Sequence, residues 1–139
     1  MAGIIDPNIH RESEEILLQI GHFFQAQDDY LDCFGDSNMT GKIGTDIEDG
    51  KCSWLCIEAL KSANNDQRKL LCQHYGIKSK ESVHIVRNIY RELCLEKIFT
   101  EYEHKKYKEI CSRIDHIENK ILPKDLFHMV LTMIYKRKQ

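Results

Sequence analysis

Apolar residues recur along much of this chain at spacings of three and four, the period of amphipathic α-helices. The first such segment follows Asp6-Pro7, a dipeptide typical of a turn or a helix start. At about 100° of rotation per residue, one broad apolar face gathers Ile16, Leu17, Ile20, Phe23, Phe24, Leu31 and Phe34. This pattern predicts a long helix that packs one side against a core.

The helical period returns at Cys52 and continues through several shorter segments. Asn64-Asn65-Asp66 is a break with the chemistry of a helix N-cap, Ser79 can cap the helix that follows it, and Gly76 is the expected C′ glycine of the helix before it. The longest of these segments, 98–121, ends before a proline. No stretch alternates with the period of a strand, so we expect an all-α helical bundle that forms a single domain, residues 1–139.

Three aspartates lie near the end of the first predicted helix. Asp28 and Asp32 share a stripe with Gln25 at the border of the apolar face, and Asp29 lies just beyond it. Carboxylates four residues apart on a helix are about 5–6 Å apart at Cβ, and their repulsion destabilises the helix. Three hard oxygen donors without an imidazole suit Mg²⁺, which keeps waters and bridges a few carboxylates to substrate phosphates.

The main irregular loop runs from Gly35 to Gly50 and carries Lys42 and Asp46, with Lys51 directly after it. A lysine ammonium group is a compact point charge for phosphate oxygens. Carboxylates and lysines within so short a span therefore suggest a site for a metal ion and a diphosphate. The same residues also fit a solvated acidic helix end followed by a mixed-charge loop, and their spacing leaves both interpretations open.

The composition narrows the class of protein. The net charge of −2, with 30% charged residues well interspersed, argues against a nucleic-acid surface. No apolar run approaches the length of a membrane span, and the first residues lack the order of a secretory signal. The six cysteines match no paired metal-binding spacing, and we expect Cys52 and Cys56 to pack as small apolar residues. A soluble, cytoplasmic protein is expected.

The sequence FFQAQDDYLDCFGD followed by TGKIGTDIEDGKCSWL resembles the second aspartate-rich region of the trans-isoprenyl diphosphate synthases, most closely that of the farnesyl diphosphate synthases. The resemblance continues to the closing IYKRK but corresponds to the C-terminal portion of that family's chain, less than half of it. It implies a partial isoprenoid-synthase fold. It also implies Mg²⁺-dependent condensation of an allylic diphosphate with isopentenyl diphosphate in isoprenoid biosynthesis.

The resemblance also implies how the aspartates share the metal. Asp28 would be the principal ligand of a Mg²⁺ ion that bridges to the diphosphate, and Asp29 and Asp32 would support it directly or through water. Asp46 would hold water bound to the metal. These four residues form the predicted metal site.

Five further residues are implied to bind substrate. Lys42 and Lys51 match the family's diphosphate-binding lysines and are the predicted catalytic cations. Phe24 and Gln25 match positions that line the allylic pocket. Arg137, in the terminal YKRK, matches the basic tail that closes over isopentenyl diphosphate.

One required motif of the family is missing, because no other D-D-x-x-D occurs and Asp66, Asp115 and Asp125 stand singly. We therefore expect half of a divided active site, weak or inactive alone, that forms a homodimer or pairs with a full-length synthase. Two other functions stay open. The chain could be a terpene synthase, which ionises one diphosphate without condensing two substrates. It could also be a non-catalytic helical partner of a full-length synthase, and a fragment of a longer chain is a further possibility.

Overall fold

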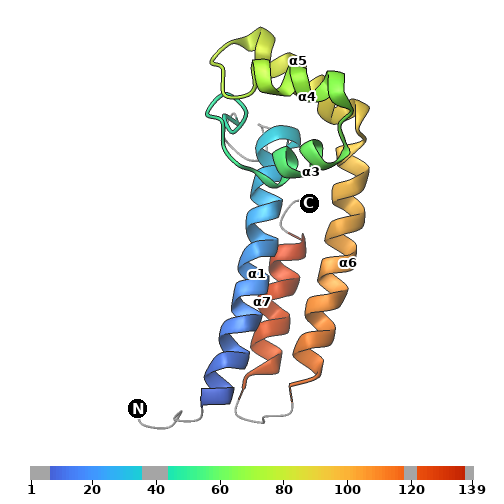
Figure 1. Cartoon of the computed structure of the whole chain (residues 1–139). Coiled ribbons are helices and arrows are strands. Elements are labelled where there is room, and N and C mark those ends of the chain that lie inside the picture. Colours follow the sequence, from blue (N-terminus) through green and yellow to red (C-terminus); the bar gives the residue numbers. More distant parts are fainter. Residues whose placement is uncertain (1–6, 36–43, 118–121, 137–139) are drawn as a thin grey trace. The chain divides into compact units, whose positions relative to one another are not determined.

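The computed structural model describes residues 7–35, 44–117 and 122–136, most of which lie in six α-helices (Figure 1). The helices are α1 Pro7–Phe34, α3 Trp54–Ser62, α4 Asn65–His74, α5 Lys80–Glu92, α6 Leu95–Asp115 and α7 Lys124–Lys136. The described residues contain no strand, which confirms the all-α prediction. None of the helices in this part of the chain is long and apolar enough to cross a membrane.

Side-chain caps set where the middle helices begin. Asn64 and Gln67 form a reciprocal capping box at the start of α4, and Ser79 caps α5, as predicted. Ser53 caps α3 by accepting a hydrogen bond from the backbone N–H of Cys56 at 3.1 Å. The prediction for Cys52 was wrong, because this residue is exposed and precedes the cap. A capping residue has an extended backbone, so the helical period cannot include the residue before it.

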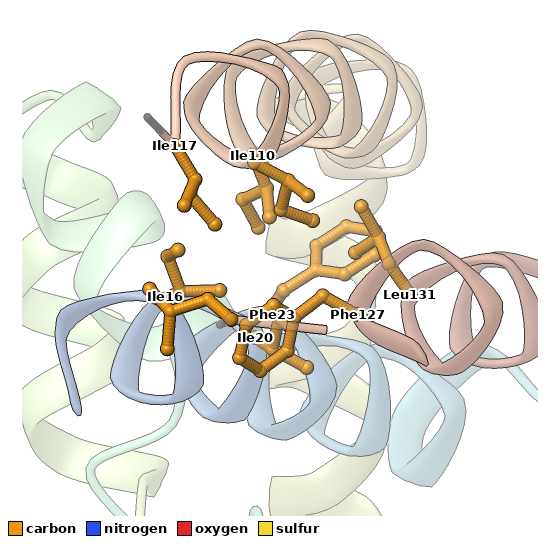
Figure 2. Packing of buried hydrophobic residues seen from close by; sticks show 9 residues of the cluster. Ile16, Ile20, Phe23, Ile110, Ile117, Phe127 and Leu131 are labelled. Carbon is orange, nitrogen blue, oxygen red and sulfur yellow. The ribbon is translucent and has the colours of Figure 1, made fainter. Parts of the chain in front are cut away.

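The chain folds into two compact units, one formed by Met1–Gln25 and Tyr102–Gln139 and the other by Ala26–Glu101. In the first unit, α7 and the matching parts of α1 and α6 run side by side (Figure 1). Figure 2 shows their buried side chains pointing toward one another, among them Ile16, Ile20, Phe23, Ile110, Phe127 and Leu131. Leu17 and Phe24 remain 54% and 39% exposed, so the predicted apolar face of α1 is wider than the surface that α6 and α7 cover.

The second unit has its own core, to which the end of α1, the turn after residue 44, α3, α4, α5 and the start of α6 contribute. Its buried members include Ile47, Leu55, Ala59, Leu71, Val86, Ile89, Tyr90 and Leu95. Tyr30 stacks on Phe99 with ring centroids 4.2 Å apart, and Trp54 meets the same ring edge-on at 5.2 Å. These contacts fix the aspartate-bearing end of α1 against the start of α3.

Candidate functional site

Asp29 lies at the centre of a cluster of carboxylates and one lysine in the second unit. Asp29 is 5% exposed, and its two carboxylate oxygens accept hydrogen bonds from different groups. Oδ1 lies 2.7 Å from Nζ of Lys51, and Oδ2 accepts the backbone N–H of Trp54 at 2.8 Å. Because Trp54 is the first residue of α3, its N–H has no partner within the helix. Asp29 therefore serves as counter-ion to Lys51 and as hydrogen-bond acceptor for the first turn of α3.

Asp32, one turn later on α1, holds the turn that carries Asp46. Oδ2 of Asp32 accepts the backbone N–H of Asp46 at 2.9 Å. Gly44 makes this approach possible: a Cβ at that position would lie 1.7 Å from the carbonyl oxygen of Asp32 and 2.6 Å from its Oδ2. Any larger residue at position 44 would push the turn away from the helix.

Lys51 is both fixed and accessible. Nζ lies 2.7 Å from Oδ1 of Asp29 and 3.7 Å from Oδ2 of Asp46, while 41% of the side chain is exposed. The hydrogen bond that Lys51 donates to Asp29 raises the pKa of the Lys51 ammonium above its ordinary value, against a smaller opposing effect of burial. The group is therefore a permanent cation at neutral pH, and part of its surface can meet a ligand.

The predicted metal ligands do not form a ready-made cage. Asp28 is half-buried on α1, beside the residues already described. In the part of the chain that the structure describes, no three histidine, cysteine or acidic side chains gather closely enough to hold a metal ion. Asp29, Asp32 and Asp46 instead join through Lys51 and two backbone N–H groups.

The remaining predicted site residues belong to the first unit or fall outside the described residues. Phe24 and Gln25 are exposed and belong to the first unit. Lys42 and Arg137 fall outside the residues that the structure describes.

A cavity of about 550 Å³ adjoins the cluster on the side of Asp32. Gly44, Ile47 and Glu48 line it together with Asp32 and Cys33, and across from them α5 and the segment before it contribute Lys78, Lys80, His84 and Arg87. Burial raises the pKa of the Cys33 thiol to about 11, although the Arg87 guanidinium acts in the opposite direction. The lining of this cavity therefore combines the acidic Asp32 and Glu48 with several basic side chains.

A sequence model described as polyprenyl synthetase matches residues 1–93, which include the whole carboxylate–lysine cluster and most of the chain. The chain belongs to this family. This finding confirms the resemblance inferred from the aspartate-rich motif.

Curated relatives extend the match to the last residue of the chain. The farnesyl pyrophosphate synthases of Murgantia histrionica, Bos taurus and Homo sapiens are each 45% identical to it over 139 residues, 100% of the chain. The same alignments cover only 34%, 39% and 33% of those three proteins. The chain thus spans little more than a third of the length of the curated relatives it matches.

Sequence reasoning missed several residues that support Lys51. The Tyr75 hydroxyl donates a hydrogen bond to the backbone carbonyl of Lys51, and the Gly76 N–H donates to the carbonyl of Ile47 at 2.9 Å. Ser53 had a detectable signal, because a serine before a helical period is a typical N-cap. Tyr75 had none, since its contact crosses 24 residues of sequence.

Proposed function

We propose that this chain supplies the diphosphate-binding half of a divided prenyltransferase site of the farnesyl diphosphate synthase type. The observation that carries the proposal is the Lys51 ammonium group, held 2.7 Å from Asp29 and 3.7 Å from Asp46 with 41% of its side chain exposed. A fixed cation beside several carboxylates suits a diphosphate that arrives with Mg²⁺, because the lysine and the metal share its negative charge.

The residues of the cluster fit Mg²⁺ as a partly hydrated ion. Mg²⁺ usually keeps several waters and takes one or two carboxylates plus substrate phosphates, so a closed protein cage is not required. Asp28 would hold the ion directly. Oδ2 of Asp32 already accepts the N–H of Asp46, so Asp32 would hold water bound to the ion, as would Asp46. When bound, the metal would stabilise the negative charge on the departing diphosphate. Asp29 would act by keeping Lys51 in place.

In the proposed reaction, the C–O bond of an allylic diphosphate breaks and the double bond of isopentenyl diphosphate supplies the electrons of the new C–C bond. Loss of a proton then restores a double bond. Lys51 would hold the leaving diphosphate. Lys42 and Arg137, which fall outside the described residues, would add further positive charge to the site. Phe24 and Gln25 would border the allylic chain.

The site is proposed to be incomplete in this chain alone. The sequence lacks another D-D-x-x-D, and the described residues of the first unit leave large apolar side chains 39–64% exposed: Leu17, Leu18, Phe24, Leu126, Met129 and Met133. We infer that a second copy of the chain or a full-length synthase covers them. These exposed side chains also favour the second candidate, a non-catalytic partner of a full-length synthase. The free cysteines suit a reducing, cytoplasmic setting.

Phosphorus NMR titration of inorganic pyrophosphate in the presence of Mg²⁺ tests the binding function. The unchanged chain should bind, and Lys51→Ala should lower its affinity at least about tenfold, because a charge-assisted contact is lost. Lys61→Ala is the matched control, since Lys61 is 67% exposed and pairs with Glu58 at 3.4 Å. No binding by the unchanged chain, or equal losses in both variants, would refute the proposal.

Product analysis separates the candidate functions. With geranyl and isopentenyl diphosphates, the chain alone should form little farnesyl diphosphate. A terpene synthase would instead convert geranyl diphosphate without the second substrate. Copurification with a full-length synthase, together with thermal stability unchanged by Mg²⁺ and pyrophosphate, would support the non-catalytic partner.

A further inference from the structure

The segment that joins α4 to α5 contacts the turn that carries Asp46 and Lys51. The Tyr75 hydroxyl donates to the carbonyl oxygen of Lys51, and the Gly76 N–H donates to the carbonyl oxygen of Ile47 at 2.9 Å. The turn itself closes through the Lys51 N–H, which donates to the carbonyl oxygen of Asp46 at 3.0 Å. The α4–α5 connection therefore holds this turn near both of its ends, at Ile47 and at Lys51. None of these bonds involves an aspartate of α1.

Two glycines let the backbones meet. Gly50 and Gly76 have φ angles of +69° and +78°, a backbone conformation that residues with a side chain rarely adopt. A Cβ at Gly50 would lie 3.3 Å from Cα of Gly76, and one at Gly76 would lie 3.4 Å from Cα of Gly50. The left-handed backbone favours glycine at both positions, and the close approach leaves little room for an added Cβ.

Both the side chain and the backbone of Lys51 are held. Its ammonium group contacts Asp29 and Asp46, and its carbonyl oxygen accepts hydrogen bonds from the Tyr75 hydroxyl and from the Ser53 N–H, the latter at 2.8 Å. Burial raises the pKa of the Tyr75 phenol, so the hydroxyl is a donor at neutral pH. Without the Tyr75 bond, the Lys51 carbonyl would keep the Ser53 N–H as a donor, but the backbone that directs this 41% exposed side chain would be held less firmly.

We propose that Tyr75 is a positioning residue for diphosphate binding, which acts by fixing the backbone of Lys51 so that its ammonium group stays between Asp29 and Asp46. This inference rests on the proposed function of Lys51. It makes the α4–α5 connection part of the diphosphate site, although neither Tyr75 nor Gly76 needs to touch the ligand.

The test is a double-mutant cycle on the full chain, with Tyr75→Phe, Lys51→Ala and the double variant. Affinity for inorganic pyrophosphate with Mg²⁺ is measured by phosphorus NMR titration, and folding by thermal melts. Tyr75→Phe should lower the affinity about fivefold to tenfold, the effect of one hydrogen bond. In the Lys51→Ala background the same change should have no further effect, because the group that Tyr75 positions is gone. Tyr107→Phe, a half-buried tyrosine of the first unit, is the control and should bind like the unchanged chain.

Each outcome has a distinct meaning. Failure of the unchanged chain to bind pyrophosphate would overturn the proposed function and the positioning role with it. Binding that survives Tyr75→Phe unchanged would overturn the positioning role alone. So would an equal loss of affinity in both backgrounds, or a Tyr75→Phe variant that no longer folds, since either result would mean that Tyr75 only stabilises the unit.

Discussion

Replacing Asp29 with alanine should destabilise the protein by about 1.5–4 kcal/mol, and the structure divides this value into two parts. The Trp54 N–H would lose an ionised acceptor 2.8 Å away, in a place where the Asp29 side chain is only 6% exposed. Hydrogen bonds to charged groups contribute about 1.5–3 kcal/mol. The ion pair with Lys51 should add only about 0–1 kcal/mol, because Lys51 is 41% exposed and water can replace its partner.

Asp29→Asn separates the two parts. An asparagine oxygen can still accept the Trp54 N–H, but the amide cannot balance the charge of Lys51. This variant should therefore lose about 1–2 kcal/mol, less than Asp29→Ala, because a neutral acceptor holds the N–H more weakly and the ion pair is gone. Asp49→Ala is a control within the same turn: Asp49 is exposed and accepts a hydrogen bond from the Thr45 hydroxyl at 2.8 Å. We expect a change within about 0.5 kcal/mol for it.

Urea unfolding followed by tryptophan fluorescence measures these differences. Trp54 is the only tryptophan of the chain, and its ring packs edge-on against Phe99 in the core of the second unit. Because Asp29 contacts the backbone of Trp54, circular dichroism should be recorded as a second probe, and coincident transitions would justify two-state analysis. The reasoning is refuted if Asp29→Ala unfolds like the unchanged protein, or if Asp29→Asn is as unstable as Asp29→Ala.

Other single positions also have expected results. Gly21→Ala should raise the free energy of unfolding by about 0.5–1 kcal/mol, because nothing lies within 4 Å of the added Cβ. Gly44→Ala should lower the melting temperature and weaken pyrophosphate binding, because the added Cβ would meet the carbonyl oxygen of Asp32. A Gly44→Ala variant that is stable and still binds pyrophosphate would contradict this close approach. At pH 8, iodoacetamide should alkylate Cys33 about 100-fold more slowly than an ordinary thiol, because its pKa of about 11 leaves little thiolate, and mass spectrometry of peptides would detect equal rates if this is wrong. Phe23→Ala should cost about 3–5 kcal/mol in thermal or urea unfolding, whereas Leu17→Ala, at a position 54% exposed, should cost much less; similar losses would place Phe23 outside the core.

Local sequence patterns predicted the helices well because helix starts depend on neighbouring residues. Ser79 was identified as an N-cap and residues 64–66 as a break with N-cap chemistry, in which Asn64 proves to be the cap. Gly76 does adopt the positive φ expected directly after the C-cap of α4. The error at Cys52 has the same local origin. Its spacing fits the apolar period of α3, but Ser53 captures a backbone N–H of the first turn and the helix begins after it.

The residues of the carboxylate–lysine cluster were identified from the sequence, but the way they divide the work was not. Spacing on a helix shows that Asp28, Asp29 and Asp32 are close, and says nothing about which of them a distant segment will approach. Asp29 contacts residues 22 and 25 positions later in the chain, and these contacts set its role. The same limit applies to Tyr75, whose partner is fixed by how α4 packs against the turn.

The repulsion between neighbouring aspartates on α1 suggests a metal ion that neutralises them. In the structure, hydrogen-bond donors of the protein itself already offset part of this repulsion. The Lys51 ammonium and the Trp54 N–H both meet Asp29, and the Asp46 N–H meets Asp32. These donors reduce the like-charge cost within the protein itself, so we expect this unit to fold without Mg²⁺. In the function we propose, the metal therefore arrives with the diphosphate, whose oxygens supply the ligands that the protein lacks. A cluster that is already neutralised in part, with one lysine left accessible, is better suited to a ligand that comes and goes than to a permanently bound ion.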